Sequence, residues 1–284
     1  MWYVLLSVFC SVTVAIILKL AKNRGHKPLH LIFLNYLVAA TLTYFVLRPD
    51  SYTGAIGNLP WHLYVPLGVL LPLIFLCIAF SIAYSGIVRT EIAQRLSLFI
   101  PLLAAFFIFH EAMAPTKLVG IGVGLCAILC AIGWHKGGKQ SNHNWIYPVC
   151  VFIGMGVIDI FFKKVALFQG VPYSFSMFLI FVLAGIITLA ILLFRLFTGR
   201  DRLELKALGW GILLGLFNFG NILFYMKAHR ALPESPSIVF TGMNIGVILL
   251  GALVGVTIFH ERLSLLNKVG LGLAVISVLI IAFL

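Results

Sequence analysis

The chain alternates between long apolar stretches and short polar connections. Ten stretches of about 20 mostly apolar residues, the length that a helix needs to cross a bilayer, follow one another along its 284 residues. They run approximately over residues 2–21, 29–47, 61–81, 88–109, 116–134, 145–167, 174–193, 207–225, 236–258 and 265–284. This pattern predicts an all-α integral membrane protein with ten transmembrane helices and no soluble domain.

The ten stretches form two sets of five with related sequences. IFHEAMAPTKLVGIGVG from Ile108 matches IFHERLSLLNKVGLGLA from Ile258, a displacement of 150 positions. We therefore divide the chain into a first five-helix repeat (1–135), a polar linker (136–144) and a second five-helix repeat (145–284). Two similar halves with an odd number of spans must be inverted relative to each other, an architecture typical of secondary transporters.

Further matches connect the two halves and carry a family resemblance. Lys19 in KLAKNRG corresponds to Lys164 in KVALFQG, and Gln94 lies 150 positions before Asn244. Each half also ends with a Phe-x-Glu step, a basic or polar residue and Gly before a last helix rich in small residues. In these features, over almost its whole length, the chain resembles the drug/metabolite transporter (DMT) superfamily, specifically its EamA-type (EamA/RhaT-like) branch. The resemblance implies an inverted-repeat transporter, whereas its substrate stays open among amino acids, sugars, nucleotide sugars, phosphorylated metabolites and drugs.

Composition places the chain in a membrane. Hydrophobic residues make up 62% of it and charged residues 10%, which is too little polar surface for a water-soluble protein. The net charge of +12 comes from Lys and Arg scattered among the connections, so nucleic acid is not an expected partner. The five cysteines lie inside apolar stretches, and His26 and His30 are predicted to be solvated loop residues. We therefore expect no metal and no cofactor.

Basic residues in the connections bear on orientation, and they conflict with the family resemblance. Connections after odd-numbered spans hold thirteen Lys and Arg residues, against six after even-numbered spans. Because basic connections normally face the cytoplasm, this count favours both termini outside. The resemblance instead implies both termini inside. Both orientations stay open at this point.

Two acid–base pairs lie inside apolar stretches, where an ionisable side chain is costly unless it faces protein or water. Glu91 and Arg95 are four residues apart on the fourth span, and Asp159 and Lys163 are four apart on the sixth. Residues at this spacing share one helical face. We expect the pairs to line two sides of one aqueous path and to exchange partners in gating and coupling. The alternative is that each pair only neutralises itself.

Amide and hydroxyl side chains that we expect to lie between the two pairs, near the middle of the membrane, are candidate substrate-binding residues. With Arg95, the set is Asn35, Tyr36, Gln94, Asn218, Asn221, Tyr225 and Asn244. We expect Arg95, Asn218 and Asn244 to be the principal contacts, in a site suited to an anionic or zwitterionic solute. For any single amide, hydrogen bonding between helices is the alternative.

The repeated Phe-His-Glu segments have a predicted structural role. His110 with Glu111, and His260 with Glu261, would suit a proton relay because histidine titrates near physiological pH. Their positions before a helix favour another role, in which the acid caps the first turn of the helix that follows. The glycines after each segment predict close packing of the last helix of each half.

Together these features predict a secondary active transporter, an exporter, that moves a small polar or amphipathic metabolite across the cell membrane by alternating access. Its expected partners are that small molecule, the lipid bilayer and, as a hypothesis, protons coupled through Glu91 or Asp159. A monomer and a homodimer are both compatible with the sequence. Dispersed acids argue against an enzyme, and the lack of a nucleotide-binding loop argues against transport driven by nucleotide hydrolysis. The alternatives are a membrane-embedded enzyme acting on a lipid-linked substrate and a non-transporting assembly subunit.

Overall fold

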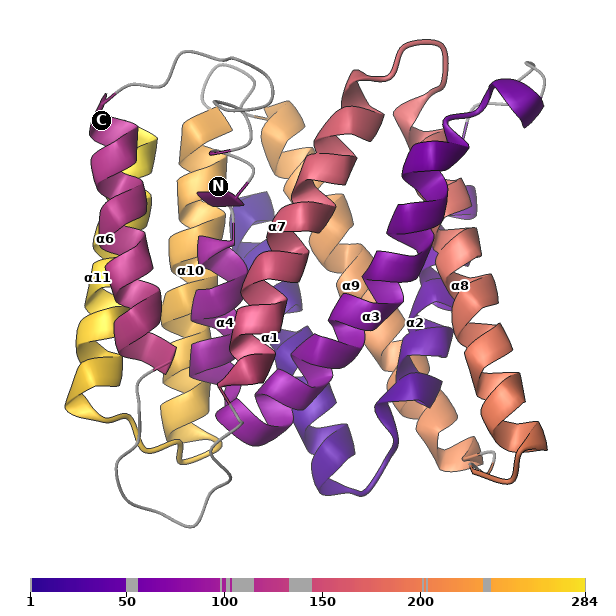
Figure 1. Ribbon diagram of the computed structural model, residues 1–284, viewed down its shortest axis with the longest axis horizontal. Helices are drawn as coiled ribbons and strands as arrows, with labels where there is room; N and C mark the ends of the chain where they lie inside the picture. The colour runs from indigo at the N-terminus through magenta and orange to yellow at the C-terminus, as the bar shows by residue number, and fades with distance from the viewer. Residues whose placement is uncertain are drawn as a thin grey trace.

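The computed structural model describes residues 2–49, 56–97, 99–100, 103, 115–132, 145–200, 202, 204–231 and 236–283. Figure 1 shows its helices side by side in one bundle. The described residues form ten α-helices: α1 (Trp2–Asn23), α2 (Pro28–Leu42), α3 (Trp61–Ser85), α4 (Ile87–Leu96), α6 (Pro115–Ile132), α7 (Ile146–Leu167), α8 (Tyr173–Phe197), α9 (Leu205–Ala231), α10 (Pro236–Thr257) and α11 (Leu265–Phe283). A π-helical turn, Thr43–Leu47, extends α2, and a 3₁₀ turn, Ile56–Asn58, precedes α3.

Each predicted span coincides, in its described part, with one of these helices. Within the described part of the chain, five helical segments are long and apolar enough to cross a membrane: Trp2–Asn23, Pro28–Leu47, Trp61–Ser85, Tyr173–Phe197 and Lys206–Ala228. Shorter apolar segments occupy α6, α7, α10 and α11. Large apolar side chains also cover the outer faces, among them Leu129 on α6 and Leu253 on α10. The predicted all-α, multi-span membrane architecture is confirmed.

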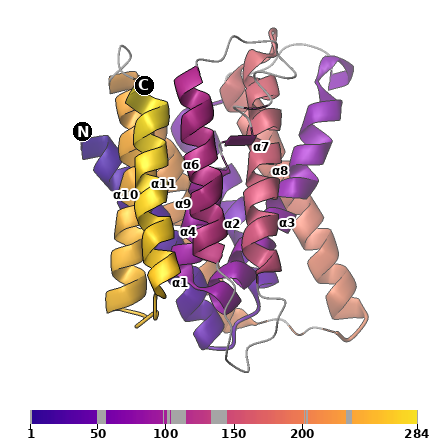
Figure 2. The same ribbon diagram turned by 60° about the vertical axis from the view of Figure 1, so that its left-hand side comes forward.

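The two halves interlock by exchanging partners. The first two helices, α1 and α2, pack on α9 of the second half, and the corresponding α7 and α8 pack on α3 of the first half. In the same way, α1 contacts α10 as α7 contacts α4, and the two last helices, α6 and α11, pack on each other. Figure 1 shows this last pair at the left edge of the bundle, and Figure 2 brings it to the front. In Figure 1 the chain descends through α1 and rises through α7, as inverted halves require.

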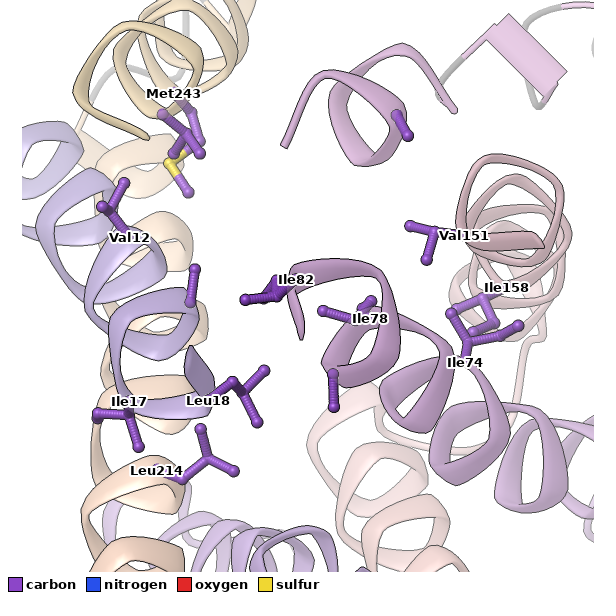
Figure 3. Packing of buried hydrophobic residues seen from close by; sticks show 14 of the residues in the cluster. Val12, Ile17, Leu18, Ile74, Ile78, Ile82, Val151, Ile158, Leu214 and Met243 are labelled. Carbon is purple, nitrogen blue, oxygen red and sulfur yellow. The ribbon is translucent and has the colours of Figure 1, made fainter. Parts of the chain in front are cut away.

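The main apolar core is therefore built from both halves. Val12 and Leu18 from α1 and Ile82 from α3 belong to the same buried cluster as Ile158 from α7 and Leu214 from α9. Figure 3 shows these residues on helices that come from distant parts of the chain. Because neither half encloses this core alone, the side chains between the halves occupy the position expected of a substrate path.

Glycines allow the closest helix approaches within this bundle. A Cβ on Gly215 of α9 would lie 2.6 Å from the Cβ of Val38 on α2, and one on Gly124 of α6 would lie 2.0 Å from the Phe99 ring. The Ser277 hydroxyl of α11 donates to the carbonyl of Gly120 at 2.7 Å. The predicted close packing of the two last helices is therefore observed there, whereas Gly122 and Gly272 have nothing within 4 Å of an added Cβ.

Candidate substrate-binding site

The first predicted acid–base pair lies on the short helix α4. A nitrogen of the Arg95 guanidinium, Nη2, lies 3.8 Å from Oε2 of Glu91, and the side chains are 18% and 3% exposed. The same nitrogen donates a hydrogen bond of 2.7 Å to the hydroxyl of Ser11 on α1. Arg95 thus reaches across from α4 to the first helix, although it remains close to the acid on its own helix.

The acid of the second predicted pair lies near the base of the first. Arg95 is within electrostatic range of the Asp159 carboxylate on α7 and of the Tyr225 hydroxyl on α9. The predicted partner of Asp159, Lys163, is on α7, but its side chain lies outside the part that the structure describes. Charged and polar groups from α1, α4, α7 and α9 therefore gather around one guanidinium, and they come from both halves.

Helix α9 presents three of the candidate residues at spacings of three and four. Asn218 donates a hydrogen bond of 2.9 Å to Oδ1 of Asn35 on α2. Asn221 accepts one of 2.8 Å from the Ser7 hydroxyl of α1 at its side-chain Oδ1. Residues at these spacings share one face of a helix, which here is turned to the first half. The predicted amides thus connect the halves directly.

These groups lie at a common depth. The start of α1 and the ends of α7 and α9 lie at the upper side of the bundle in Figure 1. Counted from these helix ends, Ser11 is nine residues into α1, Asp159 is eight into α7 and Asn221 is ten into α9. With a helical rise of about 1.5 Å per residue, that is about 12–15 Å from each end. The hydrocarbon core of a bilayer is about 30 Å thick, so the cluster lies near its middle.

Several buried polar atoms of the cluster have no hydrogen-bond partner among the described residues. They are Nδ2 of Asn35, Oη of Tyr36, Oε2 of Glu91 and Nε of Arg95. An unpaired buried donor or acceptor is costly, so such atoms mark places where a ligand or water completes the structure. The cluster therefore keeps unused donors and one unused acceptor near the midplane.

Three further candidate residues lie on α2, α4 and α10. The Tyr36 ring centroid lies 6.3 Å from that of Phe75 and 6.4 Å from that of Phe181, in an apolar group between α2, α3 and α8. Gln94 is half-buried on α4, and Asn244 is buried on α10. Ser7 and Ser11 were not among the predicted site residues, although their spacing of four residues on α1 is visible in the sequence.

The predicted role of Glu261 as a helix cap was right in kind but wrong about the helix. Its Oε1 accepts a hydrogen bond of 2.7 Å from the backbone N–H of Ile87, the first residue of α4. The following helix, α11, is instead capped by the hydroxyl of Ser264, which accepts from the N–H of Asn267 at 3.2 Å. Inversion of the halves brings Glu261 beside the other repeat, which sequence order does not reveal. Glu111 and His110 lie outside the described residues.

One histidine also differs from the sequence expectation. His30 is 4% exposed inside α2 and is not a solvated loop residue, whereas His26 contacts Glu204 at 3.2 Å. Among the described His, Cys, Asp and Glu residues, no group of three is placed to hold a metal ion. The candidate site is built from the Arg95 guanidinium, the carboxylates of Glu91 and Asp159 and the amides.

Two opposed five-helix halves with buried charges where they meet define the class of inverted-repeat membrane transporters. Residues 1–133 match the model of the EamA-like transporter family, and the chain belongs to this family. The resemblance seen in the repeated segments is thus confirmed. The chain is an integral, multi-pass membrane protein of a transporter family, whose members act on small molecules.

Two further likenesses cover nearly the whole chain. An uncharacterized protein of Haemophilus influenzae is 38% identical over 274 residues, which are 93% of this chain and 92% of that protein. The chain also superposes on a solved crystal structure with a TM-score of 0.61 and 15% sequence identity. The superposition covers 98% of this chain and 95% of the chain in that structure. The second likeness is one of fold.

Proposed function

We propose that the chain is a secondary active exporter of a small polar or amphipathic metabolite in the cell membrane, working by alternating access. The observation that supports this most is the position of Arg95. It is held by Ser11 on α1 and lies within electrostatic range of Asp159 on α7. A partly buried cation shared by both halves is a binding group that either half can complete or expose as the halves rock.

The substrate class we propose is a zwitterionic or anionic metabolite. A guanidinium binds a carboxylate through two parallel hydrogen bonds, and the Nε of Arg95 has no partner among the described residues. Nδ2 of Asn35 is a second unused donor at the same contact between the halves. The carboxylates of Glu91 and Asp159 suit the ammonium group of a zwitterion. Lys164 is exposed at the end of α7, where a lysine normally reaches the lipid headgroups.

Coupling and gating follow from competition for one guanidinium. Glu91 is close to Arg95 at 3.8 Å but without a hydrogen bond, and Asp159 approaches the same cation from the other half. A movement of α4 against α7 would transfer Arg95 from one acid to the other. The acid that loses its cation is the natural proton acceptor, so we propose proton coupling through Glu91 or Asp159.

Two other functions receive less support. A membrane-embedded enzyme would need clustered acids or an activated nucleophile, whereas the eight acidic residues are dispersed along the chain. A subunit that only assembles with other proteins would have no need for charged groups buried where its halves meet.

The test is a flux measurement on purified protein. A thermal-shift screen with amino acids, sugars and organic acids identifies a ligand, and proteoliposomes then report its movement. We expect Arg95→Gln to abolish flux while Lys206→Gln, which removes an exposed cation at the start of α9, leaves it unchanged. Uptake driven by an imposed proton gradient should be lost in Glu91→Gln or in Asp159→Asn.

Two results would contradict the proposal. One is normal flux by a well-folded Arg95→Gln variant. The other is recovery of the ligand in chemically altered form, which would favour the enzyme.

A further inference from the structure

The carboxylate of Glu261 occupies a site of its own at the end of the bundle opposite the start of α1. Its Oε1 accepts from the N–H of Ile87 at 2.7 Å, and its Oε2 accepts from that of Val88 at 3.3 Å. These are two of the first N–H groups of α4, which have no partner within the helix. Lys19 of α1 forms an ion pair with the same carboxylate. An acid at a helix start is also favoured by the helix dipole.

The surrounding backbone fits this carboxylate closely. Gly86, which joins α3 to α4, has φ +95°, and a Cβ there would lie 2.8 Å from Oε2 of Glu261. A Cβ on Gly255 of α10 would lie 3.0 Å from the same oxygen. The Lys19 ammonium lies 4.7 Å from the centroid of the Phe259 ring. Larger residues at either glycine would displace the carboxylate, so the site is built for this side chain.

The contact joins the two halves at the lower end of the bundle in Figure 1. Lys19 and the start of α4 belong to the first half, whereas Glu261 lies in the segment between α10 and α11 of the second half. That segment runs along the lower end of the bundle in Figure 1. The side chains of Lys19 and Glu261 are 16% and 13% exposed, so water screens the pair only partly.

Glu261 also fixes the helix that carries the charges of the candidate site. Ile87, Glu91 and Arg95 are spaced by four residues and share one face of α4. The start of α4 is thus held from the second half, while Arg95, two turns further along, reaches to Ser11. Displacement of Glu261 would free the start of α4 to move.

We propose that Glu261 is an inter-repeat latch and a positioning residue. Its carboxylate closes this end of the bundle by holding α1 and α4 against the second half, and it leaves the start of α4 when this end opens. The inference rests on the proposed alternating-access function, because only that function requires the end to open. A static cap would stabilise α4 equally well without ever being released.

Spin-label distances in lipid nanodiscs separate a latch from a static cap. Labels are placed at Asn23, at the end of α1, and at Leu265, at the start of α11, where both side chains are exposed. The five native cysteines are replaced by serine beforehand. We expect mainly one short distance in the otherwise unchanged chain. In Glu261→Gln a second, longer label-to-label distance should appear. The ratio of protein with the long distance to protein with the short distance should rise roughly tenfold, as expected when a charged hydrogen-bond acceptor is lost.

Companion variants identify which contact matters. Lys19→Met keeps the cap but loses the ion pair, so it should give a smaller rise. The exchanged pair Lys19→Glu with Glu261→Lys keeps opposite charges but leaves the N–H groups of α4 without their acceptor. The long label distance should therefore persist in this double variant. Glu204→Gln removes an acid that makes a partly buried contact with His26, away from Glu261, and should leave the distances unchanged.

The outcomes are decisive in both directions. An unchanged distance distribution in a well-folded, less stable Glu261→Gln protein would identify a static cap and overturn the latch. Recovery of the short distance by the exchanged pair would overturn the role of the α4 start. Because the distances require no substrate, they can support the latch even if the flux experiment contradicts transport, and the reverse also holds.

Discussion

Removal of the Arg95 guanidinium should destabilise the protein through the acid that it leaves behind. At an effective dielectric constant of about 20, charges 3.8 Å apart interact by about 4 kcal/mol, which is an upper estimate for this pair. The Glu91 side chain is 3% exposed, so it cannot turn to water when its partner is lost. Protonation of the carboxyl group reduces the cost, and we expect Arg95→Gln to lower the free energy of unfolding by about 3 kcal/mol.

A double-mutant cycle tests this magnitude. Glu91→Gln in the Arg95→Gln background removes the buried charge, so the double variant should recover stability, with a coupling energy of about 1–3 kcal/mol. Unfolding in mixed micelles, followed by tryptophan fluorescence, supplies the four free energies. Lys206→Gln is the matched control and should change stability by less than about 0.5 kcal/mol. Additive effects of the two substitutions would show that Glu91 and Arg95 do not interact, and wild-type stability of Arg95→Gln would show that the loss of the guanidinium has no cost.

Three other predictions follow from packing and charge. Gly215→Ala should destabilise the protein because its Cβ would lie 2.6 Å from Val38, whereas Gly185→Ala, whose nearest neighbour would be 3.9 Å away, should stabilise it by up to about 1 kcal/mol. Equal effects on thermal unfolding would contradict this packing. Gly86→Ala should cost at least about 1–2 kcal/mol, because φ is +95° and the Glu261 carboxylate occupies the space, and an unchanged denaturation midpoint would argue against it. The thirteen-to-six distribution of basic residues predicts an external C-terminus, so alkaline phosphatase fused after Leu284 should be active and a fluorescent protein fused there should be dark. The reverse result would favour the internal termini implied by the family resemblance.

The sequence was sufficient for the helices but not for their partners. Apolar length determines a span in a bilayer, because every backbone N–H and C=O must be paired within the helix. The repeat with an odd number of spans then requires inversion. Neither argument identifies which helices are in contact, because helix faces that contact lipid and helix faces that contact other helices are both hydrophobic.

Neighbouring residues illustrate what the sequence could not supply. Asn35 and Tyr36 entered one candidate set, yet adjacent residues point about 100° apart on a helix. Asn35 meets Asn218 of α9, whereas Tyr36 packs between the rings of Phe75 and Phe181. Glu261 was assigned to the next helix because sequence order was the only guide, while inversion placed it on α4.

The central claim is that polar groups between the halves line a path that opens to each side of the membrane in turn. Asn221→Cys, in the background without native cysteines, places a thiol on the face of α9 that meets the first half. A membrane-impermeant thiol reagent is applied separately to right-side-out and inside-out vesicles. Leu249→Cys on the exposed face of α10 is the control, because it faces lipid and should stay unlabelled from both sides.

We expect labelling of Asn221→Cys from both sides of the membrane, and protection from both sides once the ligand is bound. If Asn221→Cys stays unlabelled from one side or from both, as Leu249→Cys does, a path that opens to each side in turn is contradicted.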